Sequence, residues 1–257
     1  MKKFATAFLA LGLVLAPAFA QQAPDKFTWG SYGVRIEQAD EVEKVLRIVK
    51  DGRTQVAIRD YDLSTSFVEI TGRPPKELWV HAFSGGAHCC FTSYLFTQEG
   101  GLHNILELFH GNAGMEVKDL DGDGRGELLV YRDYGYFGGL CYACSPVAVE
   151  VYKWDGARFY DATLQFPETT NKKAAEYRWE CQDALERKAE AEELEGMALG
   201  YWANMLRVGR GAGARRWLLG AMPFQVRRWL LEHEVEIVNS ASPLGRSAAR
   251  ELPSRGE

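Results

Sequence analysis

The chain has 257 residues, with 30 Lys and Arg against 35 Asp and Glu, so its formal net charge is −5. An acidic chain is a poor candidate for general nucleic-acid binding, because nucleic-acid phosphates repel it. Its length is enough for one large domain or for one domain with an appendage. Beyond the first twenty residues, no apolar run approaches the roughly 20 residues that a membrane-spanning helix needs.

The first twenty residues have the pattern of a secretory signal peptide. Lys2 and Lys3 give it a basic start, residues 4–16 are almost entirely apolar, and residues 18–20 read Ala-Phe-Ala, a small-residue cleavage pattern. We therefore expect cleavage before Gln21 and a mature protein that is periplasmic or secreted.

Residues 21–168 have the pattern of an antiparallel β-rich domain. Residues 45–58 and 147–160 each place an Asp-Gly pair, Asp51-Gly52 and Asp155-Gly156, between two strand-like stretches, which is a hairpin signal. Further strand-like stretches cover residues 78–83, 91–96, 102–109, 115–117 and 128–131.

After Pro167 the pattern becomes helical. Residues 171–207 contain no proline and carry apolar side chains at helical spacing, which predicts one long helix or two helices joined near Gly196. The glycines between residues 209 and 213 then interrupt the pattern. A shorter helix is expected over residues 215–219, and another over residues 224–238, opened by Pro223.

These patterns predict an α+β fold with four segments. Residues 1–20 are the signal peptide, and residues 21–168 form the β-rich domain, a propeller-like or sandwich-like fragment. Residues 169–242 form an α-helical region, and residues 243–257 a flexible tail.

An acidic loop over residues 119–127 is the strongest chemical signal in the chain. Asp119, Asp121, Asp123 and Glu127 occupy loop positions 1, 3, 5 and 9, with glycines between them. Calcium prefers six to eight oxygen ligands, and a curled loop can turn alternate carboxylates inward while the main-chain carbonyl of Arg125 adds another oxygen. The spacing therefore predicts a Ca²⁺ site with these five residues as ligands.

The loop differs from an EF-hand and resembles another family. Val130 stands where an EF-hand requires a bidentate Glu, and the flanking residues indicate strands instead of helices. Over residues 117–130 the sequence resembles the FG-GAP repeats of integrin-type β-propellers and the related VCBS repeats of exported bacterial proteins. The resemblance implies the same ligands, with Glu127 where those repeats usually have Asp. A calcium ion in such a loop usually fixes strand geometry.

Five cysteines, all after the predicted cleavage site, raise the question of disulfides. Exported proteins usually oxidise their cysteines, so we expect two disulfides joining Cys89 or Cys90 to Cys141 or Cys144. Cys181 is left over. A soft zinc or copper site that includes His88 is an alternative, and redox chemistry at Cys141 and Cys144 is another, disfavoured because strand-like residues follow the pair.

No catalytic residue is assigned from the sequence. We expect a calcium-binding protein with a structural or partner-binding role, and keep as alternative a periplasmic hydrolase or thiol-metal protein with its site near His88, Cys89 and Cys90. Other histidines, among them His81 and His110, are isolated in the sequence and are expected to be structural.

Two regions are candidates for contact with a partner. The aromatic run of Tyr131, Tyr134, Tyr136, Phe137 and Tyr142 has rings that could stack on a cell-envelope glycan or a protein, or pack over the sheet. In the tail, the string Arg-Arg-Trp-Leu-Leu occurs at residues 215–219 and again at 227–231. Its arginines could touch an anionic membrane, but we expect its tryptophans to pack into a helical core.

Overall fold

The computed structural model describes residues 23–86 and 90–241 of the chain. Within them, the β-rich region forms three antiparallel sheets of four strands each, and every sheet keeps its strands in sequence order. The first sheet contains β1 (Lys26–Trp29), β2 (Tyr32–Gln38), β3 (Lys44–Lys50) and β4 (Arg53–Asp60). The second contains β5 (Asp62–Val68), β6 (Glu77–Phe83), β7 (Phe91–Thr97) and β8 (His103–Gly111). The third contains β9 (Met115–Lys118), β10 (Glu127–Asp133), β11 (Val147–Trp154) and β12 (Phe159–Asp161).

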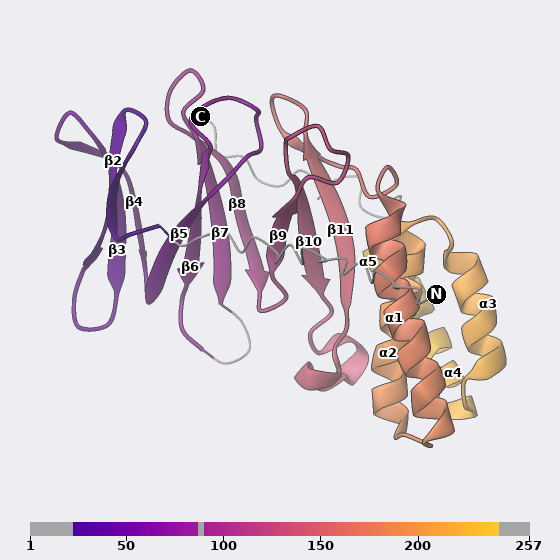
Figure 1. The fold of residues 1–257 in the computed structure, drawn as a ribbon. Helices are drawn as coiled ribbons and strands as arrows, with labels where there is room; N and C mark the ends of the chain where they lie inside the picture. Colours follow the sequence, from indigo (N-terminus) through magenta and orange to yellow (C-terminus); the bar gives the residue numbers. More distant parts are fainter. Residues whose placement is uncertain (1–22, 87–89, 242–257) are drawn as a thin grey trace, which may run out of the picture.

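The helices follow the third sheet in the chain and in space. They are α1 (Pro167–Glu186), α2 (Ala191–Arg207), α3 (Gly211–Ala221), α4 (Phe224–Glu232) and α5 (Glu234–Ala241). The three sheets stand in a row from the indigo β2 to the pink β11, and the helices lie beyond the third sheet (Figure 1). The predicted α+β class is confirmed.

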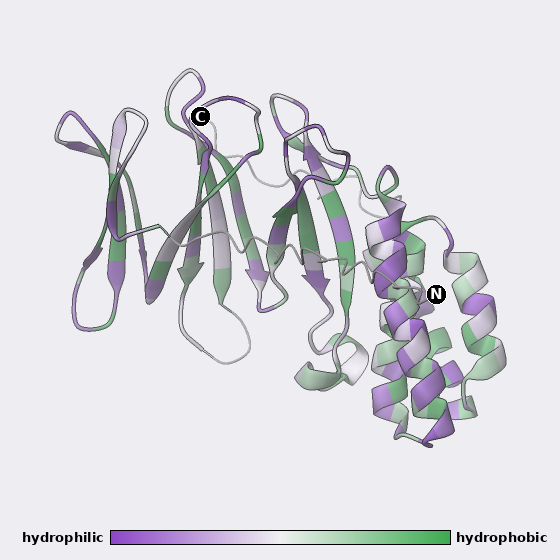
Figure 2. Cartoon of the chain, viewed as in Figure 1, coloured by the Kyte–Doolittle hydropathy of each residue, from purple (hydrophilic) through white to green (hydrophobic). Residues whose placement is uncertain are grey.

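The sheets are held together by apolar side chains from facing strands. Leu78 and Val80 of β6 pack with Leu46 and Ile48 of β3 between the first and second sheets. Trp79, between them on β6, packs with residues of the third sheet. Alternate β6 side chains thus serve two different cores, so β6 is buried on both faces. Hydrophilic and hydrophobic residues alternate along many of the strands (Figure 2).

The helices cover the part of the β11 edge that does not pair with β12. The β12 strand pairs with β11 only from Tyr152 to Trp154. Before that stretch, the buried Asn204 of α2 accepts a hydrogen bond from the Val149 N–H and donates to the Val147 carbonyl, at 2.9 Å each. Buried main-chain N–H and carbonyl groups at a sheet edge need hydrogen-bond partners. The side-chain amide of Asn204 therefore takes the place of a neighbouring strand.

The two predicted Asp-Gly hairpins are confirmed, but three helix boundaries differ from the prediction. β3 and β4 flank Asp51-Gly52, and β11 and β12 flank Asp155-Gly156. The first helical stretch breaks at residues 187–190, where Lys188 has a φ of 57°, while Gly196 lies inside α2. The helix expected over residues 215–219 begins earlier, at Gly211, so Gly211 and Gly213 lie inside α3 instead of interrupting the helical pattern. The stretch predicted as one helix over residues 224–238 is two helices that meet at His233.

Candidate functional site

The acidic loop connects β9 to β10 at the junction of the second and third sheets. The Gly126 N–H donates a 2.6 Å hydrogen bond to the carbonyl of Glu69, which follows β5 of the second sheet. A Cβ at Gly126 would lie 2.3 Å from Val117 Cγ1 and 3.2 Å from that same carbonyl. Only glycine allows this approach, so the loop is tied to both sheets.

Three of the predicted ligand side chains converge. Carboxylate oxygens of Asp119, Asp121 and Glu127 all lie within 4.8 Å of one another. Asp119 and Asp121 are exposed, whereas Glu127, the first residue of β10, is 1 % exposed. The group therefore has a buried floor and a side open to solvent.

Hydrogen bonds inside the loop set this arrangement. Asp119 accepts from the N–H groups of Gly122 at 2.7 Å and Gly124 at 3.0 Å, which curls the chain around its carboxylate. Glu127 accepts from the Leu120 N–H at 2.8 Å. Each carboxylate oxygen has more than one acceptor site, so these bonds leave lone pairs for another partner.

Asp123 and Arg125 interact with each other instead of joining that group. The Arg125 guanidinium donates to Asp123 Oδ2 at 2.7 Å, and its N–H donates to Asp123 Oδ1 at 2.8 Å. The Arg125 side chain, with its N–H, holds the pKa of Asp123 well below its usual range. Asp123 therefore stays charged and turned toward Arg125.

Lys153 of β11 supplies a positive charge that the sequence analysis missed. Its Nζ donates to Glu127 at 2.8 Å, to Asp123 at 3.3 Å and, at shorter range, to Asp121. Burial alone would lower the pKa of Lys153, but the hydrogen bonds to these carboxylates raise it above its usual value. The ammonium group thus neutralises part of the charge of the loop. No spacing within the loop could indicate this, because strand pairing brings Lys153 there.

The donor set suits a hard cation. Three converging carboxylates provide oxygen ligands alone, which favours calcium or magnesium over the transition metals. A divalent ion held by Asp119, Asp121 and Glu127 would supply the positive charge that Lys153 now supplies in part. Such an ion and Lys153 would therefore compete for the carboxylate oxygens of Asp121 and Glu127.

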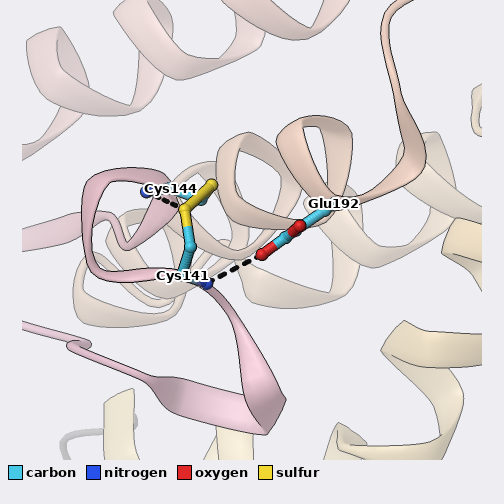
Figure 3. Close-up of side chains that lie close together, drawn as sticks. All are labelled: Cys141, Cys144 and Glu192. Carbon is cyan, nitrogen blue, oxygen red and sulfur yellow. Dashed lines mark hydrogen bonds between the residues drawn. A yellow bond between two sulfur atoms is a disulfide. The ribbon is translucent and has the colours of Figure 1, made fainter.

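The cysteines pair differently from the prediction. Cys141 and Cys144 are bonded to each other. The two disulfides expected between these residues and Cys89 or Cys90 are therefore wrong. The two residues lie close enough to bond within one turn, the 3-10 helix Tyr142–Cys144 that Cys141 caps (Figure 3). Cys90 is disulfide-bonded as well, and Cys181 is a buried free thiol whose pKa burial raises to about 12.

His88 and Cys89, proposed for the alternative hydrolase or metal site, lie outside the described residues. Because the sulfurs of Cys141 and Cys144 are bonded to each other, they offer no thiolate to a metal ion.

Two histidines of the second sheet, His81 and His110, each lie beside a serine, which the sequence did not indicate. His81 Nε2 lies 3.1 Å from Ser66 Oγ, and His110 Nε2 lies 3.1 Å from Ser93 Oγ. Burial, with a smaller effect of His110, lowers the pKa of His81 to about 4. Within the described residues, His110 Nδ1 has no hydrogen-bond partner, so no acid completes a triad with Ser93.

Most of the rings in the aromatic run pack against other residues and are not fully exposed to solvent. Tyr134 is buried, and Phe137 lies edge-on to Trp229 of α4 with ring centroids 6.0 Å apart. Tyr136 is 60 % exposed, and its ring centroid lies 5.6 Å from that of the partly buried Tyr142. Tyr131 is partly buried, and its hydroxyl donates to Glu116 at 2.8 Å. Tyr136 and Tyr142 therefore remain as the candidate recognition surface.

The tail tryptophans pack as expected. Trp217 lies edge-on to Tyr201 of α2, and Trp229 donates to the Gly138 carbonyl at 3.1 Å. Arg215 of α3 pairs with Glu234 of α5 at 2.7 Å. The two Arg-Arg-Trp-Leu-Leu strings thus hold the helical region together. Among residues 23–86 and 90–241, no helix has both the length and the apolar composition needed to cross a bilayer.

No protein-family model, curated protein or solved structure matches this chain. The resemblance of the acidic loop to FG-GAP and VCBS repeats therefore rests on residues 117–130 alone.

Proposed function

We propose that this chain is an exported calcium-binding protein, in which the ion stabilises the junction of the second and third sheets and leaves the molecule free to hold a partner. The observation that carries the proposal is the convergence of Asp119, Asp121 and Glu127, whose carboxylate oxygens lie within 4.8 Å of one another. Side chains of one sign at such distances repel, and a divalent cation between them removes that repulsion.

The place of the loop favours a structural role for the ion. Gly126 ties the loop to Glu69 beside the second sheet, and Glu127 begins the central strand β10 of the third. An ion held by this loop would lower the free energy of the folded chain relative to the unfolded chain, which lacks the assembled ligands. The exposed Tyr136, beside Tyr142, is the proposed contact for a protein or a cell-envelope glycan.

Thermal unfolding in calcium and in chelator tests this proposal. Calcium at about 100 times its dissociation constant should stabilise the folded chain by about 2.7 kcal/mol. For a chain of this size, we expect Tm to rise by roughly 5–10 °C.

Two variants make the test specific. Asp121→Asn keeps the shape of the side chain but removes a charge, and it should lose most of the calcium-dependent rise. Asp155→Asn changes the aspartate of another Asp-Gly turn, where Asp155 accepts N–H bonds from Ala157 and Arg158 at 2.9 Å each, and should keep it. Identical wild-type melting curves in calcium and in chelator would rule out the proposal.

A further inference from the structure

The Cys141–Cys144 disulfide lies in the loop that follows β10, whereas the acidic loop precedes that strand. The two features therefore occupy opposite ends of the third sheet. We propose that Cys141 and Cys144 form a thiol–disulfide exchange site. Cys141 is the sulfur that forms a mixed disulfide with an incoming thiol, and Cys144 is the resolving sulfur. This inference is independent of the calcium site.

The turn that carries the two cysteines is held by hydrogen bonds that do not involve sulfur. The Cys144 N–H donates to the Cys141 carbonyl at 3.1 Å, and the Ser145 N–H donates to the Tyr142 carbonyl at 3.1 Å. Ser145 Oγ also donates to the Cys141 carbonyl at 2.8 Å. Reduction would leave all three bonds in place.

Packing against α2 also holds the turn from outside. The Cys141 N–H donates to Glu192 Oε1 at 2.9 Å (Figure 3). A Cβ at Gly196 would lie 2.0 Å from the Cys144 carbonyl oxygen, so α2 touches the backbone of the turn directly. Because the disulfide spans a sequence separation of three, it removes little chain entropy from the unfolded state. The disulfide thus adds little to a turn that is already fixed.

The two cysteines are partly exposed, and their sulfurs are chemically unequal. Neither Cys141 nor Cys144 is buried, whereas the free thiol of Cys181 is 0 % exposed. The Cys144 N–H lies 3.0 Å from Cys141 Sγ and donates to it (Figure 3). A hydrogen bond to sulfur stabilises the thiolate more than the thiol, so Cys141 is the sulfur that carries the negative charge after reduction.

Glu192 acts in the opposite direction on the same sulfur. A Glu192 carboxylate oxygen and both sulfurs lie within 4.8 Å of one another. Its negative charge disfavours a thiolate at Cys141 and so favours the disulfide. Glu192 is thus a positioning residue that fixes the Cys141 N–H and adjusts the balance between disulfide and dithiol.

The exchange proceeds in two balanced steps. In the dithiol form, the Cys141 thiolate attacks one sulfur of a disulfide RSSR, the S–S bond of RSSR breaks, a Cys141–S–R bond forms, and RS⁻ leaves and takes a proton from water. Cys144 then loses its proton to water and attacks Cys141 Sγ, which closes the Cys141–Cys144 bond and releases a second RS⁻. One disulfide is reduced to two thiols while the protein dithiol is oxidised to its disulfide, and the reverse sequence oxidises two thiols.

Equilibration of the folded full-length protein in graded mixtures of reduced and oxidised glutathione tests this proposal. After acid quenching and alkylation, mass analysis of the peptide that contains residues 141–144 reports its redox state. We expect the pair to equilibrate with glutathione while the chain keeps its cooperative unfolding transition. A pair that stays oxidised until the chain unfolds would overturn the proposal.

Single-cysteine variants assign the roles of the two sulfurs. Cys144→Ser should accumulate one glutathione on Cys141, and Cys141→Ser should form the corresponding adduct on Cys144 much more slowly. Equal rates for the two variants would contradict the assignment of Cys141 as the exchanging sulfur.

Glu192→Gln keeps an acceptor for the Cys141 N–H and removes the charge. In the reduced protein it should raise the acid dissociation constant of the Cys141 thiol roughly fourfold, the Coulomb effect of one charge at about 5 Å in water. The pH dependence of alkylation measures this constant. Glu193→Gln is the matched control, because Glu193 pairs with Arg187, and it should leave the constant unchanged. An unchanged constant in Glu192→Gln would overturn the role of that residue.

Discussion

Lys153 reaches the acidic loop from the neighbouring strand β11 and contacts three of its carboxylates. Its side chain is only 15 % exposed, and its ammonium group lies 5.6 Å from the centre of the Phe166 ring. The carboxylates of the loop are therefore already in contact with a cation from the protein, the Lys153 ammonium group. A calcium ion that binds there must displace this cation from Asp121 and Glu127, so Lys153 lowers the affinity of the proposed site.

Lys153→Met should therefore bind calcium more tightly than the wild-type chain. The hydrogen bonds that calcium must break are charge-assisted and partly screened by solvent, so we expect roughly a tenfold gain in affinity. Without calcium the variant should be less stable, because the carboxylates lose their counter-charge. Calcium titration followed by calorimetry measures the first effect and urea unfolding the second.

Lys44→Met is the matched control for Lys153→Met. Lys44 pairs with Asp62 at 2.6 Å, on β3 and β5, far in the chain from the acidic loop. Its replacement should leave calcium affinity unchanged. Equal affinities for Lys153→Met and the wild-type chain would show that Lys153 does not compete with calcium.

The ligand group illustrates what single residues reveal in a sequence. The convergence of Asp119 and Asp121 could be predicted, because alternate residues of a curled loop turn to the same side. The capture of Asp123 by Arg125 could not, since an arginine beside an acidic loop can equally well point into solvent. The role of Lys153 depends on the pairing of β10 with β11 and has no local signal.

At the level of elements, Gly196 shows how a contact distant in sequence overrides local preference. Glycine weakens a helix, so a helix boundary near Gly196 was a reasonable prediction. The residue nevertheless lies inside α2, because the backbone of Cys144 packs where a side chain would stand. The Asp-Gly hairpins were predictable for the opposite reason, since their turns are determined by their own residues.

Gly196→Ala should destabilise the chain by about 1–3 kcal/mol, the usual cost of overpacking a close contact. The added methyl group would lie 2.0 Å from the Cys144 carbonyl oxygen, so backbone must shift. Free energies of unfolding in urea measure this effect.

Gly213→Ala provides the control within α3. No atom lies within 4 Å of a Cβ placed at Gly213, so alanine should stabilise this helix by about 0.5–1 kcal/mol. We therefore expect the free energy of unfolding to fall in Gly196→Ala and to rise in Gly213→Ala. A stabilising Gly196→Ala would contradict the close packing of α2 on the cysteine turn.

For the whole molecule, the stack of three sheets explains why the second sheet buries apolar side chains on both of its faces. Trp79 and Leu95 pack toward the third sheet, and Leu78 and Phe96 pack toward the first. The individual strands were largely visible in the sequence, but their division into three stacked sheets was not. That division depends on which faces pair, and alternation in one strand does not identify its partner.

Two partly buried histidines of the second sheet, His81 and His110, should make stability depend on pH. The pKa of His81 is about 4 in the folded chain, below the usual 6.5, mainly because of burial. The unfolded chain therefore binds more protons than the folded chain between these values, and stability falls as the pH drops from about 6.5 to 4. His110, whose pKa burial also lowers, adds to the effect.

His81 alone should account for about 3 kcal/mol of lost stability at pH 4 relative to pH 7. In His81→Gln this part of the pH dependence should disappear, while His103→Gln, which changes an exposed histidine, should behave like the wild-type chain. Urea unfolding between pH 4 and pH 7 measures the difference. Parallel curves for the wild-type chain and His81→Gln would show that His81 does not titrate as proposed.

The stack also suggests why one ion at the acidic loop could matter for the whole chain. The loop contacts the second sheet through Gly126 and begins β10 of the third, and the third sheet carries the helices. An ion bound there would strengthen the junction between the second sheet and the third sheet, which carries the helices.

Isothermal titration of the chelator-treated protein with calcium measures the stoichiometry and affinity of calcium binding. We predict one calcium ion per chain for the wild-type protein and for Asp155→Asn, and loss of most of the binding in Asp121→Asn. Absence of saturable binding by the wild-type protein at calcium concentrations on the order of 1 mM, the affinity range of weak extracellular sites, would rule out the calcium site.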